Sequence, residues 1–353
     1  MSNRNSKYGR KRRSFKMFWL IIAVLTGGGV SGLLNPDWPI VGPLVTSVKT
    51  QAIEYKNQNP LGLGSSDASG GQANPGAYAG TPAQSVSALG PNDKILIATF
   101  NIQVFGESKL RKPDAMAVIV EVIRKFDVIA IQEVRAKADD ILPRLIAELN
   151  ADGSRYDFII GPRLGRSVSK EQYAFVYDTN RIELDSASVG TIGDPGDLLH
   201  RAPFIARFRP RTTDPDRAFT FWLVDTHTDP DDVPEEVDAL AQVFQVMQTA
   251  RPDEDDVILL GDLNASEKQL GDIKKIPGIR WVVGGGVMTN TRQNKAYDNI
   301  IFCTPATQEF TGRWNVLNFE EEFNLSREEA LRVSDHFPVW AEFDVWESPD
   351  SVH

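Results

Sequence analysis

Residues 95–100 read ILIATF, and residues 127–134 read DVIAIQEV. Each segment is a short and nearly continuous apolar run, which is typical of a strand that is buried on both faces. Between them, Pro113 can open a helix at its first turn, and the apolar residues that follow it recur at helical spacing. A strand, a helix and a second strand in this order predict an α/β fold.

The same alternation of buried strands and helices continues towards the C-terminus. Further strands are predicted at 157–160, 173–177, 204–208, 219–225, 257–262, 299–303 and 337–343, and further helices at 139–149 and 234–249. We therefore expect a single α/β domain over residues 94–347, which is at the large end of the size range for one domain.

The first 93 residues differ in composition from this domain, and we divide them into three segments. Residues 1–16 carry seven basic residues and no acidic one, and residues 17–36 carry no charge over the length that a helix needs to span a bilayer. Because a cationic flank stays in the cytoplasm, we predict a basic cytoplasmic tail, a transmembrane anchor and an extracytoplasmic catalytic domain, periplasmic or on the cell surface. Residues 37–93 are rich in small and polar residues and predict a flexible linker.

A second interpretation of the N-terminal segment stays open. A basic region followed by an apolar core is also typical of a cleaved signal peptide, and Ser31 and Gly32 are small enough for cleavage. Arg12 and Arg13 fit a twin-arginine export signal. Cleavage would make the protein secreted instead of anchored.

Composition and charge narrow the kinds of site that the chain can build. A single cysteine, Cys303, excludes an intramolecular disulfide and a cysteine-cluster zinc site. With only four histidines, a metal ion should be held mainly by oxygen ligands, which suits Mg²⁺, Mn²⁺ or Ca²⁺.

The net charge is −10, and the part after residue 16 carries −17, so its overall field does not attract nucleic acid. Local arginines and metal ions would have to overcome that field.

Polar residues gather where the predicted strands begin or end. They are Asn101, Glu133, His227, Asp262, Asn264, Asp298, Asp335 and His336. Strand ends of an α/β sheet are where reacting groups collect on a rigid support. Several ionised carboxylates in one cleft need a counter-charge, because like charges raise one another's pKa, and a divalent cation supplies it.

Two kinds of side chain in this set suit metal-assisted phosphoester hydrolysis. Glu133, Asn101 and Asp335 offer hard oxygen ligands for Mg²⁺, and such an ion stabilises charge on a phosphate oxygen and lowers the pKa of an attacking water. The imidazoles of His227 and His336 can accept a proton from water and donate one to a leaving oxygen near neutral pH.

Each imidazole needs a carboxylate that fixes its tautomer, and Asp298 and Glu171 are available for this role. Taken singly, each short motif has an ordinary structural interpretation. The segment 261–264 fits an Asx turn, the segment 334–336 fits a loop or a helix cap, and a lone histidine is more often structural than catalytic. Their joint occurrence at strand ends favours a reactive site.

Eight segments between residues 94 and 346 resemble the endonuclease/exonuclease/phosphatase superfamily, in its deoxyribonuclease I-like branch. They are FNIQVFGESK (100–109), IQEVR (131–135), LGR (164–166), KEQY (170–173), RAP (201–203), GDLNA (261–265), AYD (296–298) and SDHFPV (334–339). The resemblance implies an α/β (α+β) fold built as a four-layer αββα sandwich, in which two mixed β-sheets pack together between helices.

The resemblance also implies a role for each acid–base residue. His336, held by Asp298, would be the general base that activates water. His227, held by Glu171, would be the general acid that protonates the leaving oxygen.

For the metal and the phosphate, the resemblance implies a second set of roles. Glu133 would bind the catalytic Mg²⁺ beside Asn101. Asp335 and the pair Asp262 and Asn264 would complete metal binding and phosphate orientation. Three arginines match positions that hold backbone phosphates: Arg135, Arg166 and Arg201.

The resemblance supports Ca²⁺ only weakly. The family often has acidic and threonine ligands for a structural Ca²⁺ before the tyrosine at Tyr297, and here residues 284–291 read GGGVMTNT, without the acid. Asp194 and Asp197 lie where another Ca²⁺ loop could be, although two aspartates near Gly and Pro more often form a plain turn. We expect Mg²⁺ or Mn²⁺ as the cofactor, with Ca²⁺ as an additional possibility.

Our leading functional prediction is a divalent-metal-dependent endonuclease, with a monomeric catalytic domain, that cuts DNA with low sequence specificity. The alternative is a membrane-associated phosphodiesterase or phosphatase that acts on lipid head groups or small phosphoesters, since one fold hosts many activities. A third hypothesis is a noncatalytic binding module. Such a module has little need for two imidazoles with carboxylate partners, so the intact polar set favours an enzyme.

Overall fold

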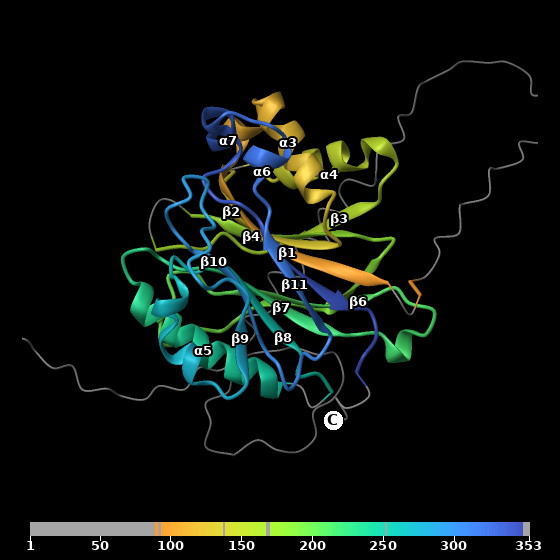
Figure 1. Ribbon diagram of the computed structural model, residues 1–353, viewed down its shortest axis with the longest axis vertical. Coiled ribbons are helices and arrows are strands. Elements are labelled where there is room, and N and C mark those ends of the chain that lie inside the picture. The colour runs from red at the N-terminus through yellow and green to blue at the C-terminus, as the bar shows by residue number, and fades with distance from the viewer. Residues whose placement is uncertain (1–88, 91–92, 137, 167–169, 251–252, 349–353) are drawn as a thin grey trace, which may run out of the picture.

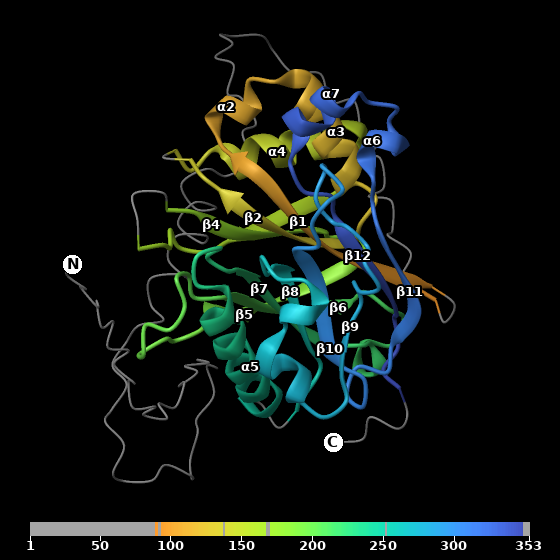
Figure 2. The same cartoon turned by 60° about the vertical axis from the view of Figure 1, so that its left-hand side comes forward.

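The structure is a computed structural model of the chain that describes residues 89–90, 93–136, 138–166, 170–250 and 253–348. Two β-sheets pack face to face, and helices cover the outer face of each (Figures 1 and 2). The predicted four-layer α/β sandwich with two mixed sheets is therefore confirmed.

Among the described residues, six strands form each sheet. The first sheet has the order β11 (Phe310–Val316), β12 (Val339–Asp344), β1 (Lys94–Phe105), β2 (Val128–Val134), β4 (Gln172–Asp178) and β3 (Tyr156–Ile160). The second has the order β5 (Ile182–Thr191), β6 (Phe204–Pro210), β7 (Phe221–His227), β8 (Val257–Asp262), β10 (Asp298–Cys303) and β9 (Ile279–Trp281). Each sheet is mixed, because β1 pairs parallel with β2 and β7 with β8 while the other pairs are antiparallel.

The helices divide unequally between the two outer faces. The first sheet is covered by α2 (Glu107–Leu110), α3 (Pro113–Ile123), α4 (Ile141–Leu149), α6 (Phe319–Glu322) and α7 (Arg327–Val333), and the second by α5 (Val233–Ala250) (Figure 2). Short 3₁₀ helices lie in the connections: η1 (Asn150–Asp152), η2 (Pro215–Arg217), η3 (Glu267–Gln269) and η4 (Gly271–Lys275).

Burial on both faces explains the continuous apolar runs of the central strands. In β1, Ile95 and Ile97 pack between the two sheets, whereas Ala98 and Phe100 pack against the helices. Successive side chains of a strand point to opposite faces, so a strand in an inner layer of the sandwich must be apolar at nearly every position. This is why these strands could be predicted from the sequence.

The parallel strand pairs bring the polar strand ends to one edge of the sandwich. Asn101 pairs in register with Gln132, the residue before Glu133. His227 at the end of β7 pairs in register with Asp262 at the end of β8, and Asp262 also pairs with Asp298 at the start of antiparallel β10. The polar ends of both sheets therefore meet.

The predictions for the N-terminal region fall outside most of the described chain. Residues 1–88 contain the predicted basic tail (1–16), the predicted anchor or signal segment (17–36) and most of the predicted linker (37–93), and they are not among the described residues. Leu89, near the end of that linker, is buried in the core between the sheets.

The predicted location of the protein requires a correction. Within the described ranges, no helix has the length and apolar character needed to cross a membrane. On this finding the prediction that a transmembrane helix anchors the protein in a membrane is wrong.

Candidate active site

The carboxylate of Asp262 lies between two imidazoles. Its Oδ2 atom is 3.5 Å from His227 Nε2 and 3.6 Å from His336 Nε2. The same oxygen accepts a hydrogen bond of 2.9 Å from Asn101 Nδ2, and Oδ1 accepts one of 2.9 Å from the backbone N–H of Asn264. Because Asp262 is only 1% exposed, these contacts form in a site from which bulk water is largely excluded.

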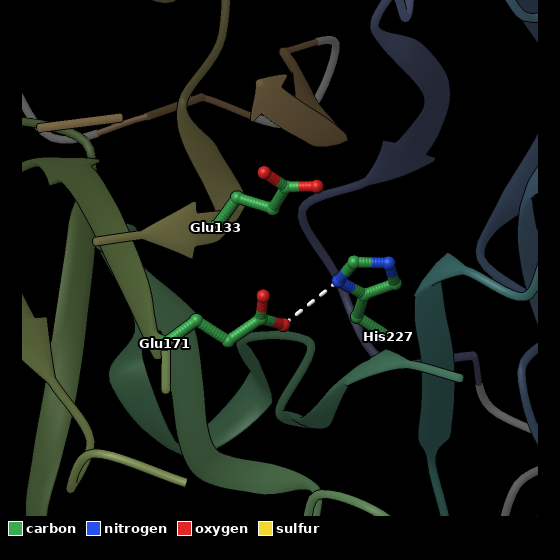
Figure 3. Close-up of side chains that lie close together, drawn as sticks. All are labelled: Glu133, Glu171 and His227. Carbon is green, nitrogen blue, oxygen red and sulfur yellow. Dashed lines mark hydrogen bonds and ion pairs between the residues drawn. The ribbon is translucent and has the colours of Figure 1, made fainter. Parts of the chain in front are cut away.

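Glu171 orients the first imidazole. Its Oε1 atom lies 2.7 Å from His227 Nδ1, and Figure 3 shows the two side chains pointing towards each other. With Nδ1 donating to this carboxylate, His227 directs Nε2 towards Asp262. The hydroxyl of Tyr173 accepts a hydrogen bond of 3.0 Å from the His227 backbone N–H and fixes the end of the strand.

The electrostatics favour a protonated His227. Burial by itself lowers the pKa of this imidazole, but the carboxylates of Asp262 and Glu171 outweigh burial and raise the pKa above its ordinary value. Burial raises the pKa of Glu171, but His227, Arg201 and Arg135 outweigh burial and lower it. The pair is therefore held as an imidazolium beside a carboxylate, which suits a general acid.

Asp298 orients the second imidazole in the same way. Its Oδ2 atom lies 2.8 Å from His336 Nδ1, and the Thr289 hydroxyl donates a hydrogen bond of 2.6 Å to that oxygen. The ring of Tyr297 stacks on His336 at a centroid distance of 5.8 Å. Burial lowers the pKa of His336, but Asp298 and Asp262 raise it well above its ordinary value, which favours the imidazolium. A divalent cation bound beside these carboxylates would offset their charge and lower the pKa of His336, as a proton-accepting role requires.

Oxygen atoms suited to a divalent cation lie beside the imidazoles. Asn101 Nδ2 lies 3.4 Å from Glu133 Oε1, while the buried Oδ1 of Asn101 accepts no hydrogen bond from any described residue. Buried acceptor atoms nearly always have a partner, so this oxygen is available to bind a metal ion or a hydrogen-bond donor. Asp335 accepts a hydrogen bond of 2.9 Å from Gln103 Nε2 and has Oδ1 4.0 Å from His336 Nε2. Carboxylate and amide oxygens fit Mg²⁺ or Mn²⁺.

Each imidazole lies in a group of three side chains whose ligand atoms are close enough together to share a metal ion. One ligand atom from each of Glu133, Glu171 and His227 lies within 4.8 Å of the other two (Figure 3). The second such group at the site contains Asp262, Asp298 and His336.

The backbone is strained where it carries this site. The non-glycine residues Val104, Glu133 and Asn264 have positive φ angles of 48°, 63° and 46°. Such conformations each cost about 1–3 kcal/mol and persist where the surrounding structure imposes them. Asn264 is held by a hydrogen bond of 2.9 Å from its Nδ2 to the carbonyl of Thr228, and Glu133 Oε2 accepts one of 2.8 Å from the N–H of Val104.

The three arginines predicted to bind phosphates lie in different environments. Arg135 is partly exposed, and its Nη2 donates a hydrogen bond of 3.0 Å to Glu171 Oε2. Arg201 is 7% exposed, with Nε 2.9 Å from Glu171 Oε1 and Nη1 donating to the carbonyl of His227 at 2.8 Å. Arg166 instead contacts the carboxylate of Asp197 at 3.0 Å. The structure therefore brings Arg135 and Arg201 to Glu171, the carboxylate that holds His227. Arg166 instead pairs with Asp197, outside this group.

Several supporting residues were not singled out in the sequence. The Ser334 hydroxyl donates to the Asn101 carbonyl at 2.7 Å and accepts from the backbone N–H groups of Gln103 at 3.1 Å and His336 at 3.2 Å. Ser334, Gln103 and Tyr173 all lie inside the segments that carry the resemblance, so proximity to the motifs was the available signal. Thr289 lies in the segment 284–291, which was considered only as a possible Ca²⁺ site.

The loop predicted as a possible Ca²⁺ site forms a turn. Asp194 accepts hydrogen bonds from the backbone N–H groups of Leu198 at 3.0 Å and Leu199 at 2.7 Å. Asp197 pairs with Arg166. These contacts match the plain-turn interpretation of the two aspartates.

Replacing Arg201 with alanine is expected to lower the free energy of unfolding by about 3 kcal/mol, because it leaves the buried Glu171 with less compensating charge. The matched control is Arg209→Ala, since Arg209 pairs with Glu183 at 3.0 Å and both side chains are more than a third exposed. Removing such a surface pair changes stability by about 1 kcal/mol or less. Urea denaturation of both variants measures the difference, and equal effects would contradict a buried structural role for Arg201.

The chain matches known proteins over most of the described domain. The family model described as "Endonuclease/Exonuclease/phosphatase family" matches residues 98–336. Deoxyribonuclease-1-like 1 of Cricetulus griseus is 34% identical over 265 residues, which cover 72% of this chain and 85% of that protein. Deoxyribonuclease gamma of Rattus norvegicus is 33% identical over 262 residues, covering 69% and 82%.

Solved structures show the same fold at lower sequence identity. The crystal structure of D. rerio TDP2 complexed with single strand DNA product is 16% identical, with a TM-score of 0.51, and the match covers 72% of this chain and 100% of that chain. At this identity, the likeness supports the fold alone.

Proposed function

Because the chain belongs to the endonuclease/exonuclease/phosphatase family and is a hydrolase of phosphodiester bonds, we propose that it is a divalent-metal-dependent endonuclease that cuts DNA with low sequence specificity. The predicted resemblance to this family is thereby confirmed. Support for DNA as the substrate comes from relatives that are named deoxyribonucleases and match about seven tenths of this chain at 31–34% identity.

The observation that carries the proposal is the pair of imidazoles that share the Asp262 carboxylate while each keeps a carboxylate of its own. Hydrolysis of a phosphodiester needs one group that takes a proton from water and one that protonates the leaving oxygen. We assign the first role to His336, held by Asp298, and the second to His227, held by Glu171. A leaving 3′-oxygen protonated in this way yields a 3′-hydroxyl and a 5′-phosphate.

Glu133, Asn101 and Asp335 are the residues that would hold the Mg²⁺ or Mn²⁺ ion. When bound, such an ion stabilises negative charge on a phosphate oxygen and lowers the pKa of a bound water. Asp262 and Asn264, which the strained turn after β8 holds together, orient the phosphate.

Local cations offset the acidic character of the domain in this proposal. Arg135, a quarter exposed beside Glu133 and Glu171, is placed to contact the phosphate next to the scissile bond. A cleft that adjoins Asn264 is lined by Lys268, Lys295 and Tyr297, which offer positive charge and an aromatic face to the flanking nucleotides.

Incubation of the full-length protein with supercoiled plasmid and Mg²⁺ or Mn²⁺ tests the proposal. We expect nicked plasmid, cleavage at many positions of an end-labelled duplex, and products that carry a 5′-phosphate. Parallel reactions on RNA, sphingomyelin and inositol phosphates measure the competing activities. A higher kcat/KM on a lipid head group or a small phosphoester than on DNA would reassign the function to the alternative hypothesis.

A further inference from the structure

A second cluster of carboxylates lies at the opposite end of β8 from the candidate active site. Asp256 directly precedes β8 and Asp262 ends it, so the extended strand separates the two residues by about 20 Å at roughly 3.3 Å per residue. Glu309 directly precedes β11, and Glu347 follows β12. Because β8 belongs to one sheet and β11 and β12 belong to the other, the cluster joins the two sheets.

The spacing of these carboxylates fits one coordinated cation. One oxygen from each of Asp256, Glu309 and Glu347 lies within 4.8 Å of the other two. Oxygen ligands lie about 2.3–2.6 Å from Ca²⁺, so two ligands on opposite sides of one ion are roughly 5 Å apart. The smaller Mg²⁺ ion demands a near-ideal octahedron and usually keeps several waters, whereas Ca²⁺ accepts irregular sets of protein carboxylates, which makes Ca²⁺ the better fit to this buried set.

Two of the three carboxylates, those of Asp256 and Glu309, are buried and incompletely hydrogen-bonded by the described residues. Asp256 is 1% exposed, and neither of its carboxylate oxygens accepts a hydrogen bond of good geometry from a described residue, although the Thr307 hydroxyl lies near enough to lower its pKa. Glu309 is also 1% exposed, and only its Oε1 is satisfied, by the backbone N–H of Ser348 at 2.8 Å. An isolated ionised carboxylate in such a place is strongly unfavourable, so the cluster needs a cation or a proton.

A proton is the competing occupant of this cluster. Burial, together with the neighbouring carboxylates of Glu309, Glu254 and Glu347, raises the pKa of Asp256 to about 9. A bound cation reverses this effect, because it favours the ionised form of each ligand. Ca²⁺ and protons therefore compete for the same oxygens.

We propose that Asp256, Glu309 and Glu347 bind one Ca²⁺ ion that ties the start of β8 in the second sheet to the segments flanking β11 and β12 in the first. The site is structural and is separate from the candidate active site at the other end of β8. Its occupation stabilises the packing of the two sheets against each other.

Thermal unfolding of the full-length protein, freed of metal with a chelator and then dialysed at pH 8, tests the site. With Ca²⁺ at about a hundred times its dissociation constant, the wild-type Tm should rise by roughly 5–10 °C. Without Ca²⁺ at pH 8, the folded wild type must keep the buried Asp256 carboxyl protonated, which opposes folding because this group ionises in the unfolded chain. Asp256→Asn removes this cost, so the variant should unfold at a higher Tm than the wild type without Ca²⁺ and should lose most of the response to the ion. Glu309→Gln is the second variant and should lose the response as well.

The control Glu133→Gln changes the candidate active site alone and should keep the full response to Ca²⁺. Calorimetric titration should show one Ca²⁺ site fewer in Asp256→Asn than in the wild type. A wild type whose Tm does not respond to Ca²⁺ would show that protons alone compensate the cluster and would overturn the proposal. Equal responses of the wild type, Asp256→Asn and Glu309→Gln, or loss of the response in Glu133→Gln alone, would also overturn it.

Discussion

The variant His336→Ala is expected to nick supercoiled plasmid about 10²–10⁴ times more slowly than the wild type at saturating DNA and Mg²⁺, which is the range for loss of a positioned general base. The reason lies in the geometry of the site. Asp298 holds Nδ1 of this imidazole at 2.8 Å, so Nε2 is the atom that faces the reacting groups, and alanine offers no group that can accept a proton there. Initial rates of nicking, measured with DNA in excess over the enzyme, report the loss.

His200→Ala is the matched control for this experiment. His200 is also an imidazole with a carboxylate partner, since its Nδ1 lies 3.0 Å from Asp229, but it has no contact with Asp262 or Asp298 among the described residues. We expect it to nick plasmid at close to the wild-type rate. Circular dichroism of both variants establishes that they are folded, and undiminished nicking by a folded His336→Ala would remove this histidine from the role of general base.

Loss of the metal ion is expected to lower the nicking rate by about as much as His336→Ala does. Chelation should stop nicking, and Glu133→Gln should lower the rate at a fixed Mg²⁺ concentration by about 10³-fold, because a bound divalent cation supplies several kcal/mol of charge stabilisation in the transition state. Glutamine keeps the shape of Glu133 but removes the charge next to the unsatisfied oxygen of Asn101. The rate as a function of Mg²⁺ concentration should therefore shift to higher concentrations.

Glu107→Gln is the control for the metal experiment, because its carboxylate is half-exposed on α2 and pairs with Arg144 at 3.3 Å. This variant should require the same Mg²⁺ concentration as the wild type. Nicking at the full rate in the presence of chelator would rule out the proposed metal-dependent mechanism.

The central strands of both sheets could be predicted from the sequence, whereas the edge strands β5, β9 and β11 could not. The edge strand β3 is the exception among the described strands, since it was predicted at 157–160. β1, β2 and β8 are apolar at nearly every position because both of their faces are buried. β5 and β11 were not predicted, because each lies at an edge of its sheet and is largely half-buried or exposed. Such strands mix polar and apolar residues without the regular alternation that identifies a strand.

The candidate site was predicted in its residue types but only partly in its contacts. The sequence pairs each imidazole with a carboxylate, and the structure brings Glu171 to His227 and Asp298 to His336. The sequence offered no signal that one carboxylate, Asp262, would contact both imidazoles. The catalytic roles of these residues remain predictions that the experiments above test.

The sequence by itself determined the family, the buried strands and the set of reactive side chains, because apolar periodicity and short motifs are local properties of the chain. Only the tertiary structure decided that Arg201 is buried against Glu171 and that Asp256 lies beside Glu309 and Glu347. These contacts join residues from distant segments, and they depend on how the two sheets pack and in which register their strands pair. No local preference of the chain encodes that arrangement.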